Sequence, residues 1–169
     1  MKKLIAVLVI ILFILSCGYE YDDIIEAPPS FITTQGVNVY VEEKNNPGPK
    51  TVGAWIDLTI IFWKFYHPAW HTCINKSLQK TNAYFLDDRW LPYYGSEVAG
   101  VAFERNGKFY ALISYSENIK FQHSRFIFMH ELSHVFVGEC GGVWDNDGSH
   151  AIFKELGLWF YDSILPKLN

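Results

Sequence analysis

An Asn-Gly pair at Asn106 and Gly107, with an apolar run on each side, constrains the fold of this chain more than any other short feature. These two residue types favour the backbone conformation that a two-residue hairpin turn requires. We therefore expect antiparallel strands over residues 98–104 and 108–115, joined by this turn. A sheet of this kind buries one face against other elements, so helices are expected to cover it.

Local patterns predict the elements around this hairpin. Alternation over residues 37–41 predicts a strand, and residues 82–86 predict a second, shorter one. Apolar periodicity and stop signals predict three helices, over residues 52–66, 122–137 and 149–164. This order of elements predicts the α+β class, with a small mixed or antiparallel sheet packed on helices.

The first and second predicted helices have defined ends. We expect Thr51 to cap the first helix and Pro68 to terminate it. Its apolar residues are expected to face the core: Trp55, Leu58, Ile61, Phe62 and Phe65. We expect the second helix to stop at Gly138, in a segment that contains two further glycines.

The N-terminal segment reads MKKLIAVLVIILFILSC. Two lysines precede an unbroken apolar run over Leu4–Leu15, whose length suits the core of a signal peptide better than a membrane span. The sequence Ile14-Leu15-Ser16-Cys17 resembles the lipobox of bacterial lipoproteins. The resemblance implies cleavage before Cys17 and attachment of lipid to that cysteine. An uncleaved anchor helix with an incidental cysteine is the alternative.

The chain is expected to divide into three parts. Residues 1–16 are a signal peptide, 17–30 hold the lipidated cysteine and an acidic tether, and 31–169 form one domain. The domain then lies outside the cytoplasm, anchored to a bacterial membrane, and Gly18 permits sorting to an outer membrane. The formal charge of −4 without a long basic run argues against nucleic acid as a partner. A monomer is the default expectation.

With Cys17 lipidated, Cys73 and Cys140 remain as an even pair. Outside the cytoplasm such a pair is a candidate disulfide. The alternatives are two buried thiols, or Cys140 as a zinc ligand.

Residues 130–134 read HELSH, inside the helix predicted over 122–137. Residues four apart lie on one face of a helix, so His130 and His134 can direct their imidazoles at one metal ion. Glu131 is rotated by about 100° from His130 and can reach a water on that ion without binding the ion. The pattern favours Zn²⁺ held by two imidazoles, with Glu131 as the general base.

A plainer interpretation competes with this one, and a second pair of histidines needs its own interpretation. HELSH can be a pair of partly buried histidines that bond Glu131 and the backbone, although burying three polar side chains together is costly. His67 and His71 are also four apart, but Pro68 between them argues against a regular helix. We interpret that second pair as a turn at a helix end.

A catalytic zinc needs a third protein ligand, with the fourth position left to water. The downstream candidates are Glu139, Asp145, Asp147, His150 and Glu155. HELSH resembles the signature of the zincin metallopeptidases, and the preceding hairpin and helix resemble a zincin core. The segment Asp147-Gly148-Ser149-His150 is similar to the third-ligand segment of SprT-type and leishmanolysin-like proteins. That similarity implies His150 as the third ligand.

The resemblance covers residues 98–165 and secures no subfamily. Val137 and Cys140 stand where metzincins place a glycine and a third histidine, and Lys154 precedes Glu155 where gluzincins have an Asn-Glu pair. What the resemblance implies is a membrane-anchored zinc metallopeptidase that acts on peptides or proteins. The alternative is a surface lipoprotein that binds zinc without catalysis, marked by a closed site of four ligands.

Overall fold

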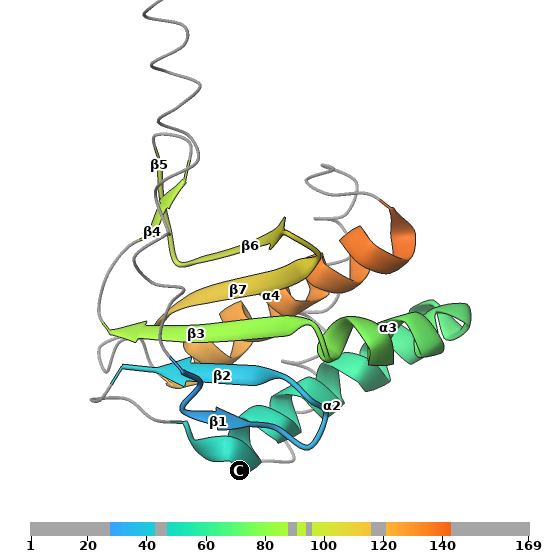
Figure 1. Ribbon diagram of the computed structural model, residues 1–169, viewed down its shortest axis with the longest axis horizontal. Helices are drawn as coiled ribbons and strands as arrows, with labels where there is room; N and C mark the ends of the chain where they lie inside the picture. Colours follow the sequence, from blue (N-terminus) through green and yellow to red (C-terminus); the bar gives the residue numbers. More distant parts are fainter. Residues whose placement is uncertain (1–27, 43–46, 88–90, 94–95, 116–120, 143–169) are drawn as a thin grey trace, which may run out of the picture.

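A computed structural model describes the chain over residues 28–42, 47–87, 91–93, 96–115 and 121–142 (Figure 1). These residues form a mixed sheet with helices packed against it. The α+β class predicted from the sequence is therefore confirmed. The predicted signal peptide and the predicted helix over 149–164 lie outside the described residues.

The main sheet has five strands in the order β1-β2-β3-β7-β6. Their bounds are β1 Phe31–Ile32, β2 Asn38–Val41, β3 Thr81–Asp87, β6 Gly100–Arg105 and β7 Lys108–Tyr115. The central strand β3 is parallel to β2 and β7, whereas the outer strands β1 and β6 are antiparallel to their neighbours. A separate antiparallel pair consists of β4 (Leu91–Tyr93) and β5 (Ser96–Val98). The sequence predicted neither β1 nor this pair.

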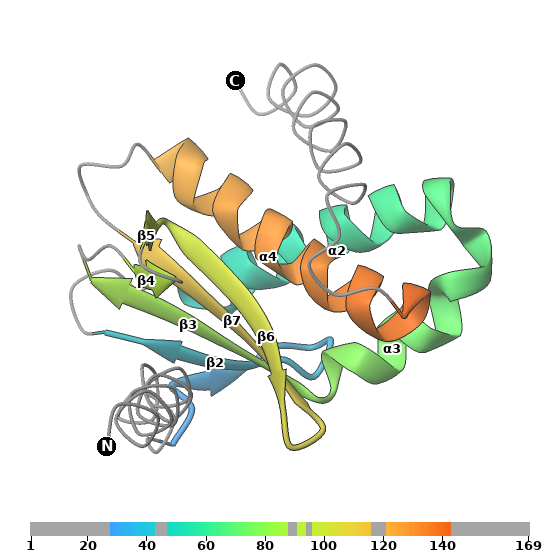
Figure 2. The ribbon, with the colours of Figure 1, turned by 90° about the horizontal axis from the view of Figure 1, so that it is seen from above.

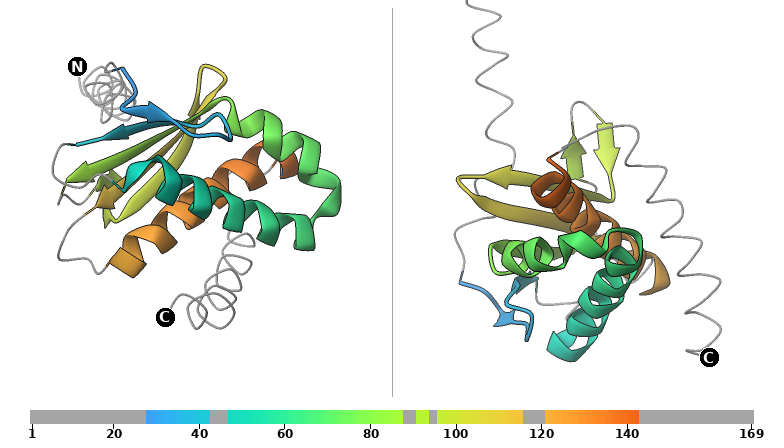
Figure 3. Two further views of the ribbon diagram at one scale, coloured as in Figure 1. Left: turned by 90° about the horizontal axis from the view of Figure 1, so that it is seen from below. Right: turned by 90° about the vertical axis from the view of Figure 1, so that its right-hand side faces the viewer.

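The helices lie together on one face of the main sheet (Figures 2 and 3). They are α2 (Gly48–Tyr66), the short 3₁₀ helix η2 (Pro68–Trp70), α3 (His71–Leu78) and α4 (Phe121–Gly141). None of those in the described ranges is both long and apolar enough to cross a lipid bilayer.

The main hydrophobic core lies between the helices and the sheet. The sheet contributes alternate residues of β3 and β7, and α4 contributes a stripe along its inner face: Ala83, Phe85, Phe109, Ala111, Ile113, Phe128, Leu132, Val135 and Phe136. The intervening residues Tyr84, Leu86, Tyr110 and Leu112 form a smaller cluster on the other face. Strand β3 is therefore buried on both faces, which agrees with the uninterrupted apolar run Ala83–Leu86 at its centre.

The β6–β7 hairpin confirms the prediction made from Asn106 and Gly107. Both residues adopt positive φ, at 54° and 72°, and Arg105 pairs directly with Lys108 across the turn. This is the conformation that an Asn-Gly pair accepts at little cost. The turn fixes the register of β6 on β7, and so places β6 at the outer edge of the sheet.

Helix α2 differs from its prediction at its start and on its exposed face. It begins at Gly48, so Thr51 lies inside the helix, and no side-chain cap bonds its N-terminus. Trp55 and Phe62 are buried as expected, but Ile61 and Phe65 are exposed. Apolar residues occur on several faces of this helix, so their periodicity alone did not identify the face that packs on the sheet.

Two features near the end of α4 also correct the sequence analysis. The helix continues through Gly138, which is buried, and ends at Gly141, followed by Gly142 with φ of 69°.

Helix α3, where only a turn was expected, lies beside α4. Cys73 of α3 and Cys140 of α4 form a disulfide, with Cα atoms 5.8 Å apart. Cys140 is thus not a zinc ligand in this fold.

Candidate metal centre

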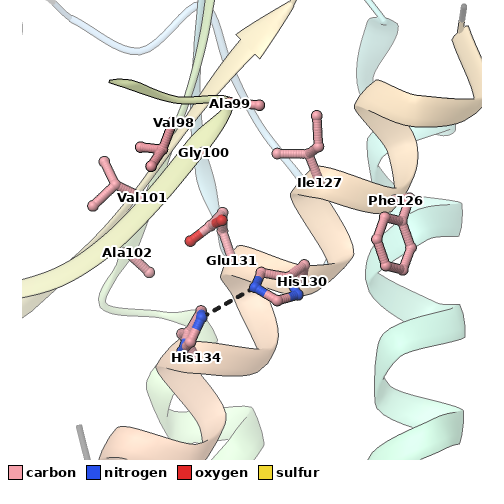
Figure 4. Close-up of a pocket in the computed structure, with 10 residues that line it drawn as sticks. All are labelled: Val98, Ala99, Gly100, Val101, Ala102, Phe126, Ile127, His130, Glu131 and His134. Atoms are coloured by element: carbon pink, nitrogen blue, oxygen red, sulfur yellow. Dashed lines mark hydrogen bonds between the residues drawn. The ribbon is translucent and has the colours of Figure 1, made fainter. Parts of the chain in front are cut away.

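The HELSH residues divide between the two sides of α4. Leu132 and Ser133 are fully buried and pack towards the helices and the core. His130, Glu131 and His134 lie on the side of α4 that faces strand β6 (Figure 4). The apolar stripe of α4 fixes its rotation on the sheet, and this rotation brings the three polar side chains to one cleft.

The two imidazoles stand close enough to share a ligand. Nε2 of His130 and Nε2 of His134 are 3.2 Å apart, and the ring planes are inclined by 80°. Two nitrogens bound to one tetrahedral zinc ion at about 2.0–2.1 Å would be separated by about 3.3 Å. The observed spacing fits this arrangement. The same spacing allows one ring to donate a hydrogen bond to the other when no ion is bound.

Glu131 is almost enclosed, with 6% of its surface exposed. Its side chain extends towards the start of β6 (Figure 4). A Cβ atom added to Gly100 would lie 2.6 Å from Oε1 of Glu131 and 2.6 Å from Cγ2 of Ile127. The absence of a side chain at residue 100 therefore makes room for the carboxylate between helix and strand.

A cleft of about 360 Å³ runs between α4 and the edge strand. Its walls are apolar except for the three polar side chains of HELSH: Val98, Ala99, Gly100, Val101, Ala102, Phe126, Ile127, His130, Glu131 and His134. A mostly apolar cleft on which a few polar groups converge is typical of a small-molecule or peptide site.

A buried hydrogen-bond chain supports the helix behind this cleft. The indole Nε1 of Trp63 in α2 donates to Oγ of Ser133 at 2.9 Å, and that hydroxyl donates to the carbonyl of Met129 at 2.7 Å. These two hydrogen bonds join α2 to the turn of α4 that carries both histidines. Sequence reasoning assigned no role to Ser133, although a serine at a core position of a helix signals a polar partner.

The third ligand is not found among the described residues. His150, Asp145, Asp147 and Glu155 lie outside the described ranges, and within those ranges no group of three or more His, Cys, Asp or Glu could hold a metal. Cys17, the predicted lipidation site, also lies outside them. Glu139 forms an ion pair with Lys80 at 3.5 Å.

The second histidine pair has a different setting from the first. The ring of His67 stacks on Trp70, with centroids 4.1 Å apart, and also lies against Trp63. His71 is exposed at the start of α3. The described residues around them complete no metal site.

Comparisons with models of protein families, with curated proteins and with solved structures found no match to this chain. The interpretation of the cleft depends on its own geometry and chemistry.

Proposed function

We propose that this chain is a membrane-anchored zinc metallopeptidase of zincin-like fold, in which His130 and His134 bind the metal and Glu131 is the general base. The observation that carries the proposal is the 3.2 Å spacing of the two imidazole nitrogens beside an enclosed carboxylate. Two nitrogen donors of this kind suit Zn²⁺ better than Mg²⁺ or Ca²⁺, which prefer oxygen.

Under this proposal, the metal-binding histidines and Glu131 have separate roles in peptide hydrolysis. Zinc bound here would polarise the peptide carbonyl and lower the pKa of a water molecule. Glu131 then accepts the proton of the attacking water and delivers it to the leaving amine. The close fit of its side chain against Gly100 holds the carboxylate in the cleft, so little reorganisation is needed.

We assign the third ligand to His150, on the similarity of its segment to the zincin third-ligand segments. The eight residues from Gly142 to His150 can extend over at most about 27 Å. Along α4, the eight residues from His134 to Gly142 rise by only about 12 Å. The chain is therefore long enough to return to the cleft. Glu155, Asp145 and Asp147 are the competing ligands.

The edge strand suggests how a substrate is bound. Strand β6 ends the main sheet in the described part of the chain, and the segment from Val98 to Ala102 lines the cleft. An extended peptide that paired with this edge would lie across the two histidines. Backbone pairing of this kind favours unfolded or extended substrates.

Zinc content and peptide hydrolysis, measured together on the full chain, test the proposal. We expect one zinc per chain, kept in Glu131→Gln and lost in His130→Ala, and hydrolysis of an unfolded casein substrate only by the parent. Loss of zinc in His150→Ala as well would support the third ligand. A folded parent that takes up no zinc would refute the proposal. Zinc bound tightly by four protein ligands, without hydrolysis, would favour the non-catalytic alternative.

A further inference from the structure

One region of the chain has an unusual charge distribution. Of the 18 acidic residues, none lies within residues 58–86, which carry Lys64, Lys76 and Lys80. The surface of this stretch is formed by the second half of α2, by η2 and by α3. A chain of net charge −4 thus has a helical region of positive charge.

The same region exposes large apolar side chains. Phe65 is 80% exposed, Ile61 54% and Tyr66 40%. They lie where α2 turns through η2 into α3, and we call residues 61–76 of this turn the helical corner. Figure 2 shows this corner at one end of the molecule, where α4 also ends. Adjacent exposed aromatics are uncommon on a surface that contacts only water.

Stacked aromatic rings and a disulfide hold the helical corner in one conformation. The stacked rings of Trp63, His67 and Trp70 fill its inner side. The ring of Tyr66 lies 4.6 Å from that of Phe62 and 5.4 Å from that of Phe65. The disulfide from Cys73 to Cys140 ties the following helix to α4. Phe65 is therefore presented on a fixed support.

We propose that the helical corner docks on an anionic phospholipid surface. Phe65 and Ile61 would enter the boundary between headgroups and acyl chains, where aromatic side chains are favoured. Lys64 and Lys76 would pair with lipid phosphates, because basic residues near such a surface are attracted to its negative charge. Lys80 contributes less, because Glu139 partly neutralises it.

Two further arguments favour lipid over a second copy of this chain. A symmetric dimer through the corner would bring together two patches that carry lysines and no acidic residue. The N-terminal anchor predicted from the sequence would hold the domain near a bilayer, and the segment from Cys17 to Pro28 can extend over at most about 40 Å. Docking that is weak by itself then suffices, because tethering raises the effective concentration.

Docking would also orient the cleft. The corner is joined to α4 through the disulfide, and α4 carries His130 and His134. A corner fixed on the bilayer would hold the cleft at a defined distance from the membrane and in a defined orientation to it. This inference does not depend on zinc or on hydrolysis.

Hydroxyl-radical footprinting of the full chain on vesicles tests the proposal. The chain is reconstituted in pure phosphatidylcholine vesicles and in vesicles that also contain phosphatidylglycerol. We expect Phe65 and Tyr66 to be modified at least about threefold more slowly with phosphatidylglycerol. Phe103, half-buried in β6, serves as the internal reference. Raising the salt to about 0.5 M should remove the difference.

Charge variants make the test specific. Lys64→Glu with Lys76→Glu should abolish the difference between the two vesicle types. Lys50→Glu with Lys108→Glu reverses two exposed lysines outside the corner, changes the net charge by the same amount, and as the matched control should preserve the difference. Equal rates on both vesicles would overturn the proposal. If the rates are equal and Phe65 and Tyr66 are modified rapidly, the corner stays in water. If the rates are equal and both residues are modified slowly, residues 143–169 or a second copy of the chain cover the corner.

Discussion

The cleft on α4 and the helical corner depart from ordinary protein surfaces in opposite ways. In the cleft, a carboxylate with 6% exposure lies among apolar walls, whereas at the corner a phenyl ring is 80% exposed. Burying a charge costs free energy unless the charge is paired or hydrogen-bonded, and exposed aromatic surface often marks contact with another molecule. Under the two proposals above, the regions are adapted to different ligands, a metal ion with a peptide in the cleft and a lipid surface at the corner.

The largest effect is expected from removing the proposed proton acceptor of the cleft. Glu131→Gln keeps the shape of the side chain but cannot take a proton from water, so kcat/KM should fall by about 10²–10⁴-fold. Zinc content should stay at one per chain, because Glu131 is not proposed as a ligand. Elemental analysis and peptide hydrolysis on the same sample check both. Unchanged hydrolysis would remove the distinction between the cleft and an ordinary apolar groove.

A pair of phenylalanines three residues apart compares the corner with the core. Phe62 is buried and Phe65 is exposed on the same helix. We expect Phe62→Ala to lower the free energy of unfolding by about 3–5 kcal/mol, and Phe65→Ala to change it by less than about 0.5 kcal/mol. Urea denaturation measures both. A large loss in Phe65→Ala would mean that the ring packs against protein, contrary to lipid docking.

A smaller effect is expected from filling the space beside Glu131. Gly100→Ala would bring a methyl group within 2.6 Å of Oε1, so the carboxylate or β6 must shift. We expect a loss of about 1–3 kcal/mol in stability from overpacking, with hydrolysis impaired and zinc content retained. Gly53→Ala is the control, because its added Cβ would lie 3.5 Å from Gln35, an ordinary contact. Equal behaviour of the two variants would show that Gly100 does not position Glu131.

The smallest effect concerns the far face of the sheet, which belongs to neither region. Burial, first, and then the neighbouring Tyr40 raise the pKa of the Tyr84 hydroxyl above its usual value near 10. The unfolded chain therefore loses this proton at lower pH than the folded chain. The contribution of the Tyr84 hydroxyl to the free energy of unfolding is fully present below about pH 10. It decreases as the pH rises further. Urea titrations between pH 9 and 11 (about one unit on each side of the ordinary pKa) should show a shallower decrease in Tyr84→Phe.

Sequence reasoning succeeded where local rules decide the structure. Asn106 and Gly107 located the hairpin because only a few residue types favour its turn, and the periodic stretch before HELSH located α4. The i, i+4 geometry then brought His130 and His134 together without any tertiary information.

The failures have a common physical cause, which is tertiary contact. Gly138 normally favours a helix end, but here it is buried within α4 and the helix continues. Helix α3 has a polar sequence that became helical against α4 and its disulfide. The close approach of Gly100 to Glu131 joins residues 31 positions apart, and no local pattern reports it. His150 and Cys17 stay predictions.

The disulfide between Cys73 and Cys140 has a consequence for resistance to proteolysis. It closes a covalent ring with a sequence separation of 67 residues, and this ring contains β3, the β6–β7 hairpin and nearly all of α4. One backbone cut at the exposed hairpin turn would leave both fragments joined through sulfur. The walls of the cleft would then stay together after such a nick, whereas the same cut in a chain without the disulfide would release two separate pieces.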